Sequence, residues 1–283
     1  MAAVDNIEVD VKTIYDWLMS ATALFVRDGS TFVPTEAAAG PWDRKILHGA
    51  AVAALLAGQL TPEDATLARL TVELVAPVPA ALLALTLGEP VGGRRVQRRG
   101  ATLTADGRVV ASATAVILKR NPLELPPTVL EHDSPFDALP PPPLDEPNRF
   151  AAELIGWESF DSSAMRYEKM RVEGDARTHQ WVSLAVPVVE GTKIRGTELA
   201  AIAGDYAQSA VGRQLPFANW IFHNAELTLH LAREPIGSWI GMRCESVIQP
   251  LGAGFNSADL FDEAGRMGRA ASTLVVERRS TKL

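Results

Sequence analysis

Cysteine is nearly absent from this sequence, because Cys244 is the only one among 283 residues. A single cysteine excludes an intramolecular disulfide and a cysteine-based metal cluster. Cys244 lies in the alternating apolar stretch GMRCESVI, which is typical of a strand residue and not of an activated nucleophile. The five histidines show no HExxH or similar ligand spacing, so neither a metal site nor a cofactor is expected.

Positive charge is also scarce. Lysine and arginine number 27 against 34 aspartates and glutamates, which gives a formal net charge of -7. Because phosphate backbones bind to concentrated basic surfaces, nucleic acid is not an expected partner. One short basic run, Arg94 to Arg99, departs from this average.

Long apolar runs are missing too, since no stretch reaches the roughly 18 residues of a membrane-spanning helix. The first residues, MAAVDNIEVDVK, lack the basic patch and apolar core of a secretory signal. With 47% hydrophobic and 22% charged residues, the composition is that of a soluble globular protein. We therefore expect no membrane span and a cytoplasmic location.

Proline, in contrast, is concentrated in one segment. Nine prolines lie between Pro122 and Pro147, and such a stretch favours an extended connector over a helix or a central strand. It divides the chain into residues 1–121, a linker over 122–147, and residues 148–283.

The two parts resemble each other in the order of their segments. Each has an apolar helix-like run, residues 48–60 in the first part and 198–215 in the second. Behind the helix comes an alternating strand in each part, ARLTVELVAPVP and AELTLHLAREPI. Each part also ends in a strand of similar composition, DGRVVASATAVILKR in the first and AGRMGRAASTLVVER in the second.

The spacing within the two parts agrees as well. Thr71 precedes Gly107 by 36 residues, and Thr228 precedes Gly265 by 37. Each part is thus predicted to be an α+β unit in which an antiparallel sheet wraps around one long helix, the hotdog arrangement. Two such units in one chain predict a double hotdog whose sheets join edge to edge and cover their free edges.

These motifs resemble those of one family, the TesB-like (type II) acyl-CoA thioesterases, and more closely their actinobacterial and fungal thioesterase-like relatives. The likeness extends from about Ala21 to Arg278. It rests on Trp42 with His48-Gly49-Ala50 ahead of the first helix, on the strand NAELTLHLAR, and on the terminal GRMGRAASTLVVER. The resemblance implies hydrolysis of an acyl-CoA or acyl-carrier thioester, and further pairing of the subunits into a homo-oligomer.

In the resembled family an Asp of the second helix, a Ser or Thr of the next strand, and a Gln of the last strand activate the hydrolytic water. Asp205 matches the first position, while Asn224 and Thr273 stand at the other two in place of the usual residues. Asp205 precedes Thr228 by 23 residues, and His48 precedes Thr71 by the same interval. Asp205 and His48 are therefore predicted to be equivalent positions of the repeat.

The resemblance also suggests a substrate site. Small residues at Gly49 and Ala50 would let a thioester approach the N–H groups of the helix N-terminus, which favour a developing oxyanion. His48 and Trp42 would orient or line the substrate, with Trp181 and Trp220 as further candidates for an acyl tunnel. The run from Arg94 to Arg99 is either a solvated strand and turn or a contact for the phosphates of coenzyme A.

Two other functions remain open on the sequence alone. A non-catalytic acyl-CoA-binding protein is one, because Asn224 and Thr273 replace the usual polar residues. An enoyl-thioester hydratase or dehydratase is the other, although the chain has no D-x-N-P-x-H motif. The acyl chain length and the choice between coenzyme A and a carrier protein are not predicted.

Overall fold

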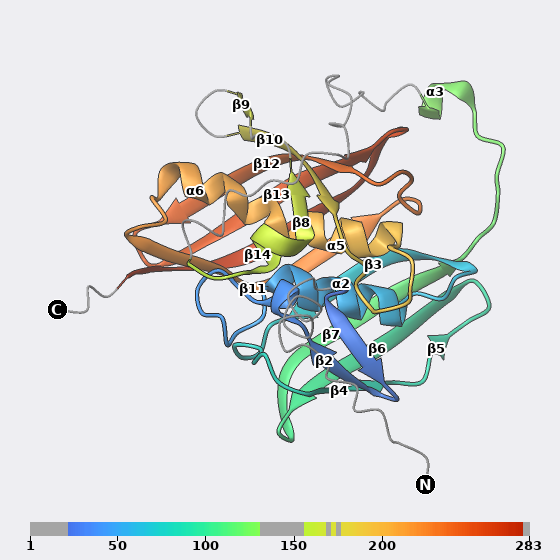
Figure 1. The fold of residues 1–283 in the computed structure, drawn as a ribbon. Helices are drawn as coiled ribbons and strands as arrows, with labels where there is room; N and C mark the ends of the chain where they lie inside the picture. Colours follow the sequence, from blue (N-terminus) through green and yellow to red (C-terminus); the bar gives the residue numbers. More distant parts are fainter. Residues whose placement is uncertain (1–21, 131–155, 168–170, 174–176, 280–283) are drawn as a thin grey trace, which may run out of the picture.

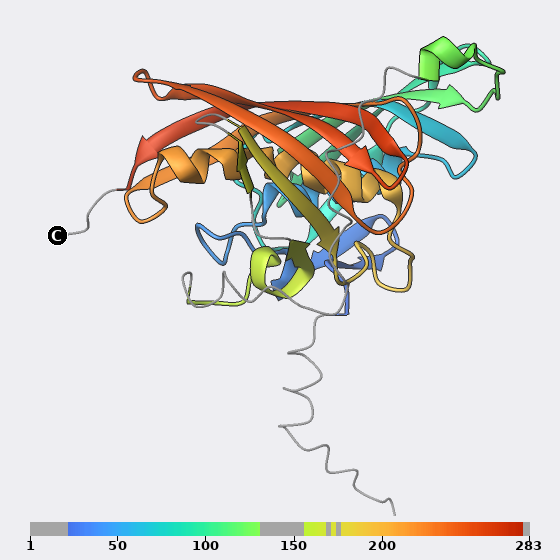
Figure 2. The same cartoon turned by 90° about the horizontal axis from the view of Figure 1, so that it is seen from above.

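The computed structural model describes residues 22–130, 156–167, 171–173 and 177–279. The first residues of the chain and most of the proline-rich segment lie outside these described residues. Within them, one 14-stranded sheet extends across the molecule, and the two principal helices lie against one of its faces (Figure 1). Seen from above in Figure 2, the orange-red strands of the second half arch over the helix of that half.

The elements of the first half are β1 (Phe25–Asp28), β2 (Thr31–Pro34), the 3-10 turn η1 (Glu36–Ala38), α2 (Gly49–Leu60), β3 (Ala65–Glu73), β4 (Leu83–Leu87), β5 (Val91–Gly92), β6 (Val96–Ala105), β7 (Arg108–Lys119) and α3 (Pro127–Leu130). Those of the second half are η2 (Phe160–Ala164), β8 (Met165–Tyr167), β9 (Arg171–Glu173), β10 (Arg177–Leu184), α5 (Gly196–Tyr206), η3 (Ala207–Ala210), α6 (Val211–Gln214), β11 (Trp220–Leu231), β12 (Ile240–Gln249), β13 (Ala253–Asp262) and β14 (Gly265–Arg278).

The two halves of the sheet meet at the antiparallel pair β3 and β11. Outward from this join the order is β3-β7-β6-β4 on one side and β11-β14-β13-β12 on the other, so the halves share one strand order. Thr71 lies opposite Thr228 at the centre of the join, and their hydroxyl oxygens are 3.2 Å apart. The two equivalent strands are therefore related by a local two-fold axis that passes between these threonines.

The β-bulges of the sheet repeat with the same offset. Thr71 and Thr228 are 157 residues apart. The bulge between Leu67 and Arg69 in β3 recurs between Asn224 and Glu226 in β11, at this offset. The bulge after Leu103 likewise recurs after Leu260. Because bulges interrupt a ladder at specific positions, their recurrence shows that the halves share a register as well as an order.

This register corrects one sequence prediction. Gly107 and Gly265 were expected to be equivalent, although the interval from Thr71 to Gly107 is one residue shorter than that from Thr228 to Gly265. The ladders pair Ala105 with Arg108 and Asp262 with Gly265, so Arg108 is the residue equivalent to Gly265. The mismatch arises because the two turns place glycine differently: Gly107 lies within its turn, and Gly265 begins the strand.

Helix α2 is buried over nearly its whole length, as its composition predicts. Residues 50–57 are all at most 2% exposed. A helix without a polar face must be covered on all sides, and here the sheet and helix α5 cover it. In the described part of the chain, none of the helices has both the length and the apolar character that a membrane crossing requires.

The second helix is broken, although residues 198–215 were expected to form one helix. The α-helical part ends at Tyr206, and a 3-10 turn and the short α6 follow. The side-chain amide of Asn224 donates to the carbonyl oxygen of Asp205 at 2.9 Å. This carbonyl would otherwise accept an N–H from the next helical turn, so a strand residue competes with the helix at its break.

The proline-rich segment also departs from expectation in its described part. Pro127–Leu130 forms one helical turn, α3, where an extended connector was expected. Proline is compatible with the first position of a helix because its missing N–H has no intrahelical partner there.

Candidate functional site

Asp205 lies near the end of α5, where that helix passes the N-terminus of α2. Its side chain is buried, with the whole residue only 2% exposed. One carboxylate oxygen, Oδ1, accepts a hydrogen bond of 2.8 Å from the amide of Asn224. The other, Oδ2, lies 3.5 Å from His48 Nδ1 and has no hydrogen-bond partner among the described protein atoms. A buried acceptor without a partner is unusual, and it is available to a water molecule or a substrate.

Helix α2 gives Asp205 room because it begins with glycine. A methyl group at Gly49 would lie 2.8 Å from Asp205 Oδ1 and 3.2 Å from a methyl carbon of Leu74. At the other end of the helix pair, a methyl group at Gly58 would lie 2.4 Å from Glu198 Oε1. The two helices therefore run antiparallel, and each glycine faces a carboxylate of α5.

His48 is the N-cap of α2. Its Nδ1 accepts the Ala50 N–H at 3.0 Å, so the ring proton of neutral His48 is on Nε2. Nε2 lies 3.9 Å from Oδ2 of Asp161. The other oxygen of Asp161, Oδ1, accepts a hydrogen bond from the hydroxyl of Tyr206. The imidazole is thus held between two carboxylates and stacks on the Tyr206 ring at 5.7 Å between centroids.

Burial sets the electrostatics of the site. The pKa of Asp205 is raised above its ordinary value of 3.8, chiefly because burial disfavours the charged form, and Asp161 raises it further. His48, the Asn224 amide and the Ala50 N–H act in the opposite direction. Burial and the neighbouring Asp161 also raise the pKa of Tyr206 well above 10, so this phenol remains a hydrogen-bond donor.

A buried polar network supports Asn224 from behind. Its Oδ1 accepts hydrogen bonds from Ser272 Oγ at 3.1 Å and from Asn256 Nδ2 at 3.4 Å. Asn256 in turn accepts the hydroxyl of Ser246 at 2.6 Å. Since the Asn224 oxygen is engaged by these donors, its amide N–H groups must point toward Asp205.

A cavity of about 450 Å³ opens beside the carboxylate. Of the residues predicted from sequence, Trp42, His48, Gly49, Asp205 and Asn224 line it. Its other walls are mainly apolar and include Leu74, Val75, Pro77, Val78, Ile221 and Val275. Trp42 stacks on Phe217 at 4.2 Å between ring centroids, beside the cavity.

Thr273 does not reach this site, which corrects the sequence prediction. It is exposed on the opposite face of the sheet, where its N–H and hydroxyl donate to Glu226. Because side chains alternate along a strand, the neighbouring Ser272 points inward and joins the network instead. Asn224 does reach the site, because it lies at the bulge of β11 and its side chain donates to Asp205 directly.

Other sequence candidates fall outside the cavity. Trp181 packs in a separate buried cluster with Trp239 and Phe261, and Trp220 lies under the guanidinium of Arg278. Ala50 contributes its N–H to His48 and does not line the cavity. The run from Arg94 to Arg99 is exposed up to Arg98, and its residues from Val96 onward pair with the far end of β7. The start of β7 lies next to the cavity wall at Ala76.

Three polar residues of the site were missed by the sequence reasoning. Ser272 could have been found from strand alternation, since it shares the inward parity of Ala270 and Leu274. Asn256 gives the same signal, because it shares the inward parity of Ala258 and Leu260. Asp161 gives none, since it follows the proline-rich segment outside any strand. Within the described residues, no group of three or more His, Cys, Asp or Glu side chains is arranged to hold a metal ion.

Comparison with solved structures places this fold among hotdog proteins. A hotdog-fold protein of unknown function from Alicyclobacillus acidocaldarius is 19% identical, with a TM-score of 0.65 over 92% of this chain and 98% of its own. A protein provisionally described as a thioesterase II from Thermobifida fusca is 17% identical, with a TM-score of 0.67 over 92% and 97%. An acyl-CoA thioesterase II from Mycobacterium marinum is 11% identical, with a TM-score of 0.61 over 94% and 99%.

No curated protein matches the sequence. Family models do match, and they cover both halves of the chain. The model of the acyl-CoA thioesterase N-terminal domain matches residues 38–118, and that of the C-terminal domain matches residues 133–276. The chain therefore belongs to the acyl-CoA thioesterase family.

Proposed function

We propose that the chain folds as a double hotdog and hydrolyses acyl-CoA thioesters with a water molecule activated by Asp205. The two units would be residues 1–121 and 148–283, joined by the linker over 122–147. The observation that carries the proposal is the unpartnered Oδ2 of Asp205, buried beside a largely apolar cavity.

In this mechanism Oδ2 accepts a proton from a water molecule held in the cavity. The water oxygen attacks the thioester carbonyl carbon, the C–S bond breaks, and the proton passes to the leaving thiolate. A raised pKa suits Asp205 to this role, because a stronger base removes the proton more readily near neutral pH. The Asn224 amide would fix the carboxylate so that Oδ2 faces the water.

The start of α2 would stabilise the oxyanion. The Ala50 N–H is already bound by His48, whereas Gly49 lines the cavity, so we assign the oxyanion to the Gly49 N–H. His48 would hold this helix start in place as its N-cap. The apolar walls at Leu74, Val75 and Ile221 would contact the acyl chain.

A hydratase or dehydratase is a second candidate, because such enzymes use an Asp and His pair and His48 lies 3.5 Å from Asp205. The pair is poorly arranged for that chemistry, since Nδ1 of His48 is occupied by the Ala50 N–H. An acyl-CoA-binding protein without activity is the third candidate, and it would need no activated water.

The test is release of free coenzyme A from a panel of acyl-CoAs, detected with a thiol reagent. Asp205→Asn should lower kcat at least about a thousandfold, because the base is lost while the Asn224 hydrogen bond can persist. Thr273→Ala is the control, since it removes a polar group from the other face of the sheet. Equal background release by wild type and Asp205→Asn, with binding retained, would leave only the binding protein, and water addition to enoyl-CoA without thiol release would establish the hydratase.

A further inference from the structure

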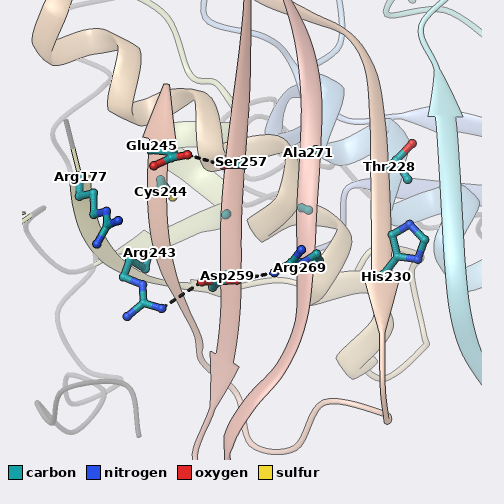
Figure 3. A pocket seen from close by; sticks show the side chains of 12 residues that line it. Arg177, Thr228, His230, Arg243, Cys244, Glu245, Ser257, Asp259, Arg269 and Ala271 are labelled. Carbon is teal, nitrogen blue, oxygen red and sulfur yellow. Dashed lines mark hydrogen bonds and ion pairs between the residues drawn. The ribbon is translucent and has the colours of Figure 1, made fainter. Parts of the chain in front are cut away.

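A second hollow lies away from Asp205, on the outer face of the sheet. It has a volume of about 550 Å³ and is lined by residues of β10, β11, β12, β13 and β14 (Figure 3). On β14 its exposed residues Arg269 and Ala271 alternate with the inward-facing Ala270 and Ser272. The groove and the proposed hydrolytic site are therefore on opposite sides of the same strands.

Arginines surround this groove. Figure 3 shows Arg177 and Arg243 at one side and Arg269 at the other, with Asp259 between them. Asp259 pairs with Arg243 at 3.0 Å, lies 3.6 Å from Arg269, and also contacts Arg266. One carboxylate is thus shared by three guanidinium groups, and each of these has more donors than Asp259 can accept.

The charge of the groove is opposite to that of the whole chain. The three arginines that line the groove face two carboxylates, Asp259 and Glu245, which leaves an excess of one positive charge when histidine is neutral. The chain as a whole carries -7. Beyond Arg269 the row of facing residues continues with His230 in β11 and Arg69 in β3.

Each of Arg243 and Arg269 lies opposite Asp259 on the strand between them, and one carboxylate cannot occupy all their N–H donors. An anion bound over the groove would accept from the remaining donors. Guanidinium groups form paired hydrogen bonds to phosphate oxygens, and those of Arg243 and Arg269 start from strands separated by one intervening strand, roughly 10 Å apart.

Small residues make the groove deep enough for a ligand. Ala271 lies between Ser257 and Thr228 on the neighbouring strands, so short side chains form the floor below the arginines. The hydroxyls of Ser257 and Thr228 lie at this floor and donate to Glu245 and Glu226. The volume is within the range of small-molecule sites, roughly 300–1,000 Å³.

We propose that this groove binds a diphosphate group of a small molecule. Arg243 and Arg269 would hold the two phosphates from either side, with Arg177 at the rim and the hydroxyls below. The diphosphate could belong to a free nucleotide or to coenzyme A itself, and the experiment below separates these sources. The binding claim does not depend on the hydrolytic mechanism.

The experiment is calorimetric titration of the full chain with inorganic pyrophosphate at low and moderate salt. We expect saturable binding that weakens as salt rises, because exposed charges are screened. Arg243→Gln with Arg269→Gln should weaken binding at least about tenfold for each arginine removed. Arg27→Gln with Arg108→Gln is the matched control, since it removes two exposed arginines elsewhere and should leave binding unchanged.

A second variant keeps the test valid if the double arginine variant does not fold. Ala271→Glu keeps every arginine and places a negative charge on the groove floor, so it should also abolish pyrophosphate binding. If ADP competes with pyrophosphate and the arginine variant has an unchanged KM for acyl-CoA, the diphosphate belongs to a free nucleotide. If the arginine variant has a raised KM for acyl-CoA, the diphosphate is that of coenzyme A. No saturable binding, equal binding by both arginine pairs, or self-association through this face without pyrophosphate binding would overturn the proposal.

Discussion

Asp205 and Asp161 flank the same imidazole, so the charge of Asp161 acts on the ionisation of Asp205. Asp161 raises the pKa of Asp205, after the larger effect of burial. Removal of the Asp161 charge should therefore make the Asp205 carboxylate easier to ionise. Since the proposed base must be ionised, the activity of the enzyme should depend on Asp161 even though Asp161 need not contact the substrate.

We predict that Asp161→Asn shifts the acid limb of the pH profile of kcat/KM to lower pH. The sign follows from the lowered pKa of Asp205, because a larger fraction of the base is then ionised in acid. Asp64→Asn is the control, since this exposed carboxylate lies in the turn after α2. An acid limb that stays in place, or moves to higher pH, would separate Asp161 from the base.

At the residue scale, the family resemblance named several residues that line the cavity of the candidate site. These are His48 and Gly49 at the start of α2, Asp205 in α5, and Asn224 in β11. Thr273 was wrong because the family match did not take strand alternation into account, and Ser272 has the inward position. Asp161 could not be found, since its proximity to His48 depends on how the chain returns after the proline-rich segment.

At the scale of elements, α2 and α5 approach through two glycines that face different carboxylates. We predict that Gly49→Ala lowers kcat/KM about tenfold or more, because the new methyl group would push the Asp205 carboxylate and Leu74 aside. Gly58→Ala is the matched substitution at the other end of the helix pair, where the obstacle is the carboxylate of Glu198, which does not line the cavity. It should keep nearly full activity, and an equal loss of activity in both variants would contradict this reading of Gly49.

Glu198 should make the helix pair sensitive to pH. Burial raises its pKa from 4.5 to about 7, against the opposing hydrogen bond from the Arg195 N–H. A folded pKa above the unfolded one means that stability is highest below about pH 4.5 and is lost as pH rises toward 7. The shift corresponds to a free energy on the order of 3 kcal/mol.

We therefore expect Glu198→Gln to flatten the dependence of the unfolding free energy on pH between 4.5 and 7. Urea denaturation at several pH values measures this. Glu63→Gln, an exposed carboxylate, should leave the dependence as in wild type. A slope unchanged by Glu198→Gln would show that other groups cause it.

The helices themselves were largely predictable from composition and the strands from alternation. The break after Tyr206 was not, since it depends on a hydrogen bond from Asn224, a residue of the next strand. The equivalence of the two turns was also missed by one residue, because glycine was used as the anchor and only the ladder pairing reveals the register.

For the whole molecule, the join between the halves carries one unfavourable pair. Glu73 of β3 lies directly opposite Glu226 of β11. Glu226 accepts hydrogen bonds from Thr273 and Thr228, whereas Glu73 is exposed and accepts one from Ser112 at 3.3 Å. The repulsion can thus be relieved at Glu73 without disturbing the bulge that Glu226 supports.

We predict that Glu73→Gln raises the unfolding free energy by about 0.5 kcal/mol at low salt, and by less at high salt. Thermal or urea unfolding at two salt concentrations checks this. Glu63→Gln again serves as control, since its loop position has no facing strand. A decrease in stability would mean that the hydrogen bond from Ser112 outweighs the repulsion.

The 157-residue offset also shows that equivalent interior positions of the two halves carry different side chains. The counterparts of Asn224 and Ser272 in the first half are Leu67 and Ala115, both completely buried. His48 and Asp205, likewise counterparts, meet each other near the local axis. Two identical subunits would have to duplicate every such group, whereas one continuous polypeptide keeps apolar residues in one half and the polar network in the other. It therefore carries the candidate site once per molecule.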